Sequence, residues 1–439
     1  MNIEGILIAA LLGTFLGGSL FWIPGFRYLP LLGILINWSG SSHFFLTDPT
    51  VIMVFYMALL ISASFVNTIP AFLFSAPQPV TFFLVGPGRK YLREGRAYQG
   101  CMTVGTGSMI GVGLIIVLSP FFLNLFRPVI RTARPYYPLI LGLLILYMVG
   151  GEIILHLKRY IRTRRKNDFR NIFLAPGIFL LISIFGITVF ESKIDFSIDF
   201  PTTITAVLSG LILFPSLIAK LINPVMSATV SDEINDTRER KFGVRGGFGG
   251  LLGGLMAIMF PGISSGLGAF LSGHVSGSGR EKSFLISQGV CKTLLAGGSF
   301  LLLFIPYRHI YRGSLAIAFS PYYPSPQSPR IFYLMVGIIL MSGCLAYFIL
   351  AVVSRFSCRL VTKINGRLLS ISIITVITAV IGFQNFQALV VLFTATCLGS
   401  LPLICGCRRS NIFAIFLMPI FMRVVGLYNQ IVEFFNGFF

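Results

Sequence analysis

The hydrophobic pattern of the chain consists of long apolar runs separated by short polar segments. About ten of these runs extend for roughly 18 residues or more, close to the length that an α-helix needs to cross a bilayer. Hydrophobic residues make up 55% of the 439 residues, and charged residues only 11%. We therefore predict an all-α polytopic membrane protein, with spans near 48–74, 97–125, 135–157, 171–191, 203–220, 283–306, 331–354, 366–384, 386–405 and 411–430.

Two further apolar elements, 5–37 and 247–273, are each interrupted by a Pro-Gly dipeptide. Proline removes an amide donor, and the glycine after it permits a tight reversal of the chain. Each element therefore predicts a helical hairpin. Both elements read G-x3-G-x6-P-G, with the same spacing between the packing glycines Gly13, Gly17, Gly250 and Gly254 and the breaks Pro24-Gly25 and Pro261-Gly262.

The number of spans after each hairpin predicts how the two halves are oriented. Five spans follow each one, and because five is odd, the second hairpin enters the membrane from the opposite side. We predict two inverted-topology repeats, each a Pro-Gly-broken helical hairpin followed by five transmembrane helices. Residues 1–220 form the first repeat, 221–246 a cytoplasmic connector and 247–439 the second repeat.

The distribution of charge supports this alternation of spans. The formal net charge is +20, and basic residues concentrate in loops that the alternation places on one side, namely 86–97, 158–170, 221–246 and 355–367. The positive-inside rule makes that side cytoplasmic. The chain is expected to be a multi-pass protein of the cell (cytoplasmic) membrane, and the charge requires no nucleic-acid partner. The apolar start lacks a basic n-region, so we expect no cleaved signal peptide.

The two breaks are the first candidate binding elements. Freed backbone groups cost several kcal/mol each in hydrocarbon unless protein or water satisfies them. Hairpin tips near the midplane would offer amides to an anion and carbonyls to a cation. This reasoning assigns substrate binding to Pro24, Gly25, Pro261, Gly262, Ser264 and Ser265. The alternative is a pair of proline kinks whose glycines only permit close helix packing.

Polar residues inside apolar runs give the second group of candidates, because each is costly there. Arg27 and Lys292 are candidates for pairing with an anionic substrate, with Thr293 beside Lys292. The candidates for coupling to Na+ or H+ are Asn67, Thr68, Gln78 and Glu152. There are three alternatives to these roles. Arg27 would snorkel to the membrane interface, and Glu152 would balance a neighbouring cation. The polar side chains of 67–79 would only bond to backbone groups that the prolines leave free.

Enzymatic, metal and cofactor chemistry are not expected. Cys405 and Cys407 form a lone C-x-C, which favours inert core thiols over a metal or redox site. The four histidines are far apart in sequence and form no ligand motif. Without nucleotide-binding loop, nucleophile elbow or paired acids, the sequence predicts no enzyme, no cofactor and no metal.

The segment FVNTIPAFLFSAPQPVTFFLVGPGRKYLREGRAYQG (65–100) resembles archaeal membrane proteins similar to TctA, the large membrane subunit of tripartite tricarboxylate transporters. IPYRHIYRGS (305–314) is similar to a later region of that family. The resemblance covers nearly the whole chain, but the matching residues are sparse outside these segments. It implies that the glycines and prolines of both broken elements correspond to those of the family. It also implies that the family's loop motif corresponds to Pro77, Pro87, Gly88, Gly95 and Tyr98. Arg89 and Lys292 depart from the family pattern.

This resemblance implies uptake of small carboxylates driven by an ion gradient and, in bacteria, fed by a periplasmic binding protein. The first hypothesis is a secondary transporter for an anionic organic solute, working by alternating access, either as a single chain or as a homodimer. One alternative is a flippase for a polyprenyl-phosphate lipid, whose phosphate would meet Arg27 and Lys292. A second alternative is a non-transporting scaffold subunit of a membrane complex.

Overall fold

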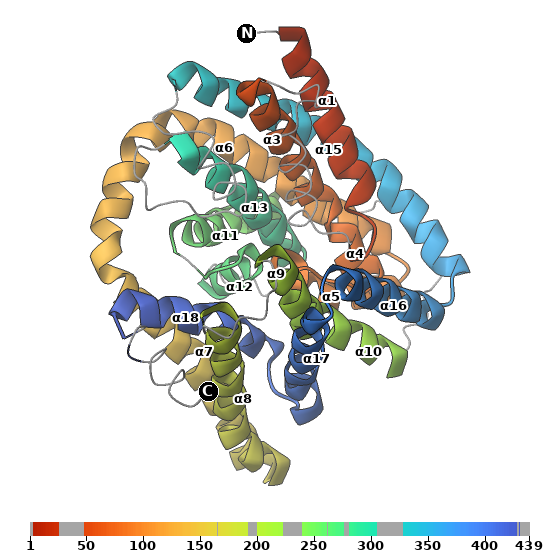
Figure 1. The fold of residues 1–439 in the computed structure, drawn as a ribbon, viewed down its shortest axis with the longest axis vertical. Coiled ribbons are helices and arrows are strands. Elements are labelled where there is room, and N and C mark those ends of the chain that lie inside the picture. The colour runs from red at the N-terminus through yellow and green to blue at the C-terminus, as the bar shows by residue number, and fades with distance from the viewer. Residues whose placement is uncertain are drawn as a thin grey trace. The chain divides into compact units, whose positions relative to one another are not determined.

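The computed structural model describes residues 3–25, 48–164, 166–191, 200–222, 239–260, 262–275, 281–304, 328–427 and 430. Within these ranges the secondary structure is helical and contains no strand, as the apolar runs predict (Figure 1). Ten helices are long and apolar enough to cross a membrane, counting only the described residues. The chain is therefore a multi-pass membrane protein.

The described helices fall into two compact units that interleave along the chain. Unit 1 comprises Met1–Val129, Ala219–Met259 and Ile263–Ile373, and unit 2 comprises Ile130–Ile218, Phe260–Gly262 and Ile374–Phe439. Each unit therefore draws on both of the predicted halves. The division of the chain into inverted repeats stays a prediction.

Most of the described helices belong to unit 1. They are α1 (Ile3–Leu20), α3 (Pro49–Val66), α4 (Thr68–Leu73), η1 (Pro79–Leu84), α5 (Val85–Arg93), the larger part of α6 (Ala97–Ala133), α11 (Glu239–Met259), α12 (Ser265–Val275), α13 (Glu281–Leu301), η4 (Leu302–Phe304), α15 (Pro329–Lys363) and the start of α16 (Gly366–Gln384). Most of α13 and α3 is buried, because α13 packs against α11, α12, α3, η1 and α15.

The remaining helices belong to unit 2. They are η2 (Arg134–Tyr136), α7 (Tyr137–Thr163), α8 (Lys166–Glu191), α9 (Phe200–Leu208), the π-helical turn η3 (Ser209–Leu213), most of α10 (Phe214–Ile222), α17 (Gln387–Cys405), η5 (Arg409–Phe413) and α18 (Ala414–Val425). In place of the predicted span near 411–430 the chain forms η5 and the 12-residue α18. At 1.5 Å per residue, α18 is shorter than the hydrocarbon core.

The second broken element is a helical hairpin in the described residues. α11 ends at Met259, Gly262 adopts the left-handed conformation with φ +81°, and α12 begins at Ser265. A Cβ atom on Gly253 would lie 2.6 Å from the backbone of Gly268, so the two helices pack with their backbones almost touching. Because Gly253 and Gly268 flank the break on opposite sides, α12 runs back along α11.

The glycines of both broken elements pack against the span that follows in the sequence. A Cβ atom on Gly13 would lie 2.2 Å from the Phe55 carbonyl oxygen, and one on Gly17 2.4 Å from that of Leu59. Figure 1 shows the two helices concerned, α1 and α3, side by side. The contact positions advance by four residues on both helices, so α1 and α3 run parallel.

The same contact recurs between α11 and α13. A Cβ atom on Gly250 would lie 2.4 Å from the Val290 side chain, and one on Gly254 2.7 Å from that of Leu294. These helices also run parallel. The chain therefore returns between α11 and α13, through α12. The recurring contact matches the glycine repeat seen in the sequence.

Candidate functional site

Lys292 of α13 is buried inside unit 1, where it contacts polar atoms at a helix junction. Its side chain is 2% exposed, and its ammonium group donates to the Phe65 carbonyl at 3.4 Å, to Asn67 Oδ1 at 3.3 Å and to Thr68 Oγ1. Asn67 separates α3 from α4, so these oxygens belong to a helix junction whose backbone is partly opened. An ammonium group has three donor protons, and each has an oxygen within reach here.

The structure therefore brings together Lys292, Asn67 and Thr68, which the sequence assigned to two different roles. Lys292 occupies the oxygens that were expected to hold a coupling cation. No carboxylate bonds to this ammonium group among the described residues. The assignments themselves stay predictions.

The tip of the second hairpin meets the same helix. Gln288 Nε2 donates to the Gly266 carbonyl at 3.2 Å, and the Cys291 thiol donates to the Ser265 carbonyl at 3.0 Å. The Ser264 hydroxyl accepts from the Leu267 amide at 3.2 Å and so caps the start of α12. Polar side chains of α13 thus bond to backbone carbonyls in the first turn of α12.

The other predicted site residues lie elsewhere. Thr293 packs against Gly111 of α6. The Gln78 amide donates to Thr81 Oγ1 at the start of η1, and Gly25 follows α1 with φ +91°. Glu152 belongs to α7 in unit 2. Arg27, Pro261 and the segment 305–314 lie outside the described residues, as does most of the connector 221–246.

Unit 1 also contains a cavity of about 450 Å³, which the sequence did not predict. Its lining carries three cationic side chains, Arg89, Lys220 and Arg367, and none of the residues that line it is acidic. Lys220 is 6% exposed, Arg89 is half-buried, and Arg367 is exposed. Burial lowers the pKa of Arg89, and the nearby charge of Arg93 lowers it further. An arginine guanidinium nevertheless stays protonated in proteins.

Two of these cations, Lys220 and Arg89, are held by the chain that ends α4. Lys220 Nζ donates to the Phe74 carbonyl at 3.3 Å, and Arg89 Nε donates to Ser75 Oγ at 3.3 Å. Ser75 has φ +56°, in the left-handed region that usually selects glycine at the end of a helix. Strained residues of this kind cluster at functional sites.

The start of α16 forms another part of the lining. Asn365 Oδ1 accepts from the Arg367 amide at 3.0 Å and caps this helix. A Cβ atom on Gly366 would lie 3.2 Å from Lys220 Cε, so glycine lets the lysine lie directly against the helix start. The positive end of the helix dipole adds to the charges of the three cations. Chemically, the cavity suits an anion with several carboxylate or phosphate oxygens.

One short helix links the cavity to Lys292. α4 begins at Thr68, which contacts Lys292, and ends before Phe74, which accepts from Lys220. Its six residues span roughly 9 Å at 1.5 Å per residue. The sequence signals for this cavity were the lysine at the end of the predicted span 203–220 and Arg89, which departs from the family pattern. The partners of the lysine come from distant loops, so spacing alone could not reveal them.

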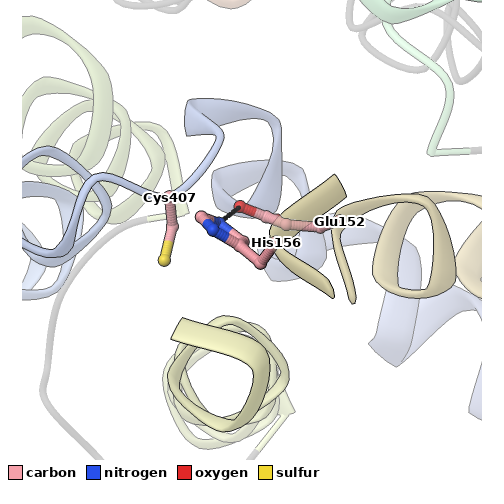
Figure 2. Close-up of side chains that lie close together, drawn as sticks. All are labelled: Glu152, His156 and Cys407. Atoms are coloured by element: carbon pink, nitrogen blue, oxygen red, sulfur yellow. Dashed lines mark ion pairs between the residues drawn. The ribbon is translucent and has the colours of Figure 1, made fainter. Parts of the chain in front are cut away.

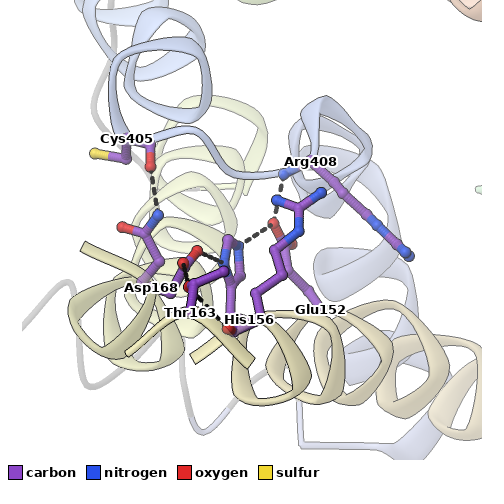
Figure 3. A network of polar contacts seen from close by, with 8 residues as sticks. Glu152, His156, Thr163, Asp168, Cys405 and Arg408 are labelled. Atoms are coloured by element: carbon purple, nitrogen blue, oxygen red, sulfur yellow. Dashed lines mark hydrogen bonds and ion pairs between the residues drawn. The ribbon is translucent and has the colours of Figure 1, made fainter. Parts of the chain in front are cut away.

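Glu152 lies in a separate polar network in unit 2 (Figure 3). Its Oε1 accepts from the Arg408 amide and its Oε2 from Asn411 Nδ2 at 2.7 Å. His156 lies one turn further along α7, with Nε2 3.8 Å from Glu152 Oε1. Positions i and i+4 share a helix face. The spacing of these two residues in the sequence is therefore a signal for the pair, although the sequence-based assignment gave a role to Glu152 alone.

Comparison with known proteins places this architecture in a family. The profile of the tripartite tricarboxylate transporter TctA family matches residues 7–414. The chain is also similar to an uncharacterized protein of Methanocaldococcus jannaschii, with 24% identity over 378 residues that cover 83% of this chain and 86% of the relative. No solved structure matches. Because the family profile spans most of the chain, the protein belongs to the tripartite tricarboxylate transporter TctA family and is a multi-pass transporter component.

Proposed function

We propose that this protein is a secondary transporter that carries a small carboxylate across the cytoplasmic membrane by alternating access, driven by a gradient of Na+ or H+. The observation that carries the proposal is the cavity of unit 1, in which Arg89, Lys220 and Arg367 face the start of α16 without an acidic residue in the lining. A di- or tricarboxylate supplies several oxygens for such a set of donors. Membership of the TctA family supports the choice of carboxylates over other anions.

The positions of the three cations support a binding site on the cytoplasmic side. Arg89 and Arg367 lie in segments predicted to be cytoplasmic, and Lys220 comes directly before a third such segment. The cavity is thus lined by residues of two of these segments and by the lysine directly before the third. In this proposal it receives the substrate in the inward-facing state, and α4 connects it to the hairpin tip through Lys292.

Lys292 takes a specific part in this proposal. Its ammonium group occupies the position between the side-chain oxygens of Asn67 and Thr68. A fixed positive charge there would stand in for a bound cation, so the coupling ion would bind at another place. The supply of substrate by other subunits of a tripartite system belongs to the same proposal.

Direct binding tests the site. Isothermal titration of citrate and of succinate into the purified full-length protein should give saturable binding. Lys220→Met should weaken it about 10–100-fold, because a charge-assisted hydrogen bond contributes roughly 1.5–3 kcal/mol. Lys363→Met is the matched control, since Lys363 is an exposed lysine at the end of α15 that does not line the cavity.

Two results would overturn the assignment of the cavity. One is equal binding of citrate by the Lys220→Met and Lys363→Met variants. The other is binding of a polyprenyl phosphate but of no carboxylate, which would favour a lipid-carrier flippase. Absence of binding of either ligand would favour a scaffold subunit.

A further inference from the structure

A second cluster of reactive side chains lies in unit 2, and the transport proposal does not use it. Glu152 and His156 project from α7 toward Cys407, which lies in the loop after α17 (Figure 2). A carboxylate oxygen, an imidazole nitrogen and the thiol sulfur all lie within 4.8 Å of one another. The side chains of all three residues are buried, with 1%, 1% and 7% exposure.

His156 is the least satisfied member of this cluster. Neither of its ring nitrogens has a hydrogen-bond partner among the described residues. Nε2 lies 3.8 Å from Glu152 Oε1, and Nδ1 lies 3.6 Å from Asp168 Oδ1. Both distances exceed a normal hydrogen bond. A buried polar atom without a partner is costly, so something beyond the protein atoms is expected to satisfy this ring.

The spacing of the donor atoms fits a shared metal ion. Ligands held at roughly 2.0–2.3 Å from one tetrahedral ion lie about 3.3–3.8 Å from each other. The separation of Glu152 Oε1 and His156 Nε2 is 3.8 Å, at the upper limit of that range, so the ligand atoms would draw slightly closer together around a bound ion. Because Glu152 and His156 share one face of α7, both can reach an ion next to the Cys407 sulfur.

The residues around the cluster provide the orienting contacts of a metal site. The Asp168 carboxylate faces Nδ1 of His156 and accepts a hydrogen bond from Thr163 Oγ1 at 3.3 Å (Figure 3). Asn411 holds the second carboxylate oxygen of Glu152 at 2.7 Å. A small shift of the ring on metal binding would bring Nδ1 into hydrogen-bond contact with Asp168, the carboxylate–histidine arrangement that is typical of zinc sites.

The charges agree with a divalent cation. Glu152 and a Cys407 thiolate would supply two negative charges, and Asp168 adds a third behind His156. The Arg408 guanidinium passes 4.0 Å from the Cβ position of Gly151, the residue directly before Glu152. Metal binding at a thiol breaks the S–H bond, forms a metal–sulfur bond and releases the proton to water.

We propose that Glu152, His156 and Cys407 bind a borderline-soft divalent cation such as Zn²⁺. One oxygen, one nitrogen and one sulfur ligand favour this class over Mg²⁺ or Ca²⁺, which prefer oxygen alone. The ion ties the 406–408 loop to α7 and leaves a fourth position for water. The proposal does not depend on transport, because all three ligands belong to unit 2 and the carboxylate cavity belongs to unit 1.

Titration with Co²⁺ tests the site directly. Full-length protein in detergent, first stripped of metal by a chelator, should bind about one Co²⁺ per chain. It should develop the near-ultraviolet charge-transfer absorption of a thiolate bound to cobalt. Cys407→Ser should abolish this band, and His156→Gln should weaken Co²⁺ binding at least 10-fold. Cys405→Ser is the matched control and should keep both properties, because only the carbonyl of Cys405 bonds within the network.

A second measurement needs no variant. Zn²⁺ should raise the melting temperature of the metal-stripped wild-type protein by a few degrees, a chelator should reverse the rise, and Mg²⁺ should not reproduce it. The proposal is wrong if Co²⁺ gives no charge-transfer band with the wild-type protein. Equal bands in the Cys407→Ser and Cys405→Ser variants, or the absence of a Zn²⁺ effect on melting, would also overturn it.

Discussion

At the scale of residues, two buried lysines show how this protein places positive charge in an apolar setting. Lys220 and Lys292 are 6% and 2% exposed, and both donate to backbone carbonyls at the ends of helices. The carbonyl end of a helix carries a partial negative charge, which stabilises a nearby cation. Neither ammonium group has a carboxylate bonded to it among the described residues. Lys292 has an oxygen within reach of each of its protons, whereas Lys220 also lines the cavity, where it can contact an anionic ligand.

Ser75 allows a prediction about strain at the cavity. The residue has φ +56° and its hydroxyl accepts from Arg89. Ser75→Gly should relieve about 1 kcal/mol of backbone strain, whereas Ser75→Ala should retain the strain. Both variants remove the hydroxyl that orients Arg89, so both should bind citrate more weakly than wild type.

Thermal unfolding and citrate titration of the two Ser75 variants separate these effects. Ser75→Gly should melt at a higher temperature than Ser75→Ala, with a similar loss of affinity in each. Unchanged affinity in both variants would show that the hydroxyl does not position Arg89.

At the scale of elements, close helix contacts depend on particular glycines of α11. A Cβ atom on Gly253 would meet the backbone of Gly268 at 2.6 Å, whereas one on Gly243 of the same helix would meet nothing within 4 Å. Gly253→Ala should therefore destabilise the hairpin by about 1–3 kcal/mol. Gly243→Ala should be neutral or slightly stabilising, because alanine is the better helix former.

Melting temperatures of the purified Gly253→Ala and Gly243→Ala variants, measured side by side, check this prediction. A Gly253→Ala protein as stable as Gly243→Ala would mean that α11 and α12 do not pack as closely as described.

The elements also show what the sequence could predict. The second hairpin followed from Gly262 and the short apolar run after it, and the structure has α11, the break and α12 in that order. The long spans followed from apolar length alone. Local patterns determine such features, because a proline or a glycine acts on its own stretch of backbone.

Contacts between distant segments could not be predicted in this way. Lys220 meets Phe74, and Glu152 meets Asn411, across 146 and 259 residues of chain. One sequence contains no signal for pairs so far apart, since either residue alone fits many partners. The cavity of unit 1 and the cluster at Cys407 therefore became apparent only from the folded chain.

At the scale of the whole molecule, the basic loops predict which residues share one side of the membrane. Arg93, Arg162 and Lys363 are exposed and lie in loops expected to be cytoplasmic, and Arg131 is exposed in a loop expected on the other side. Single cysteines at these four positions, in a background without the native cysteines, should sort into these two groups. Labelling with a membrane-impermeant maleimide in intact cells should modify only the cysteine at 131. Labelling at 93, 162 or 363 would contradict the alternation of spans.

Uptake into liposomes is the most direct test of the central claim, that this TctA-family protein carries carboxylates through a cationic cavity. Purified protein should accumulate labelled citrate or succinate above the external concentration when an inward Na+ or H+ gradient is imposed. Lys220→Met should transport poorly, and Lys363→Met should match wild type. If folded wild-type protein accumulates no di- or tricarboxylate under either gradient, or if Lys220→Met transports as well as wild type, the account is contradicted.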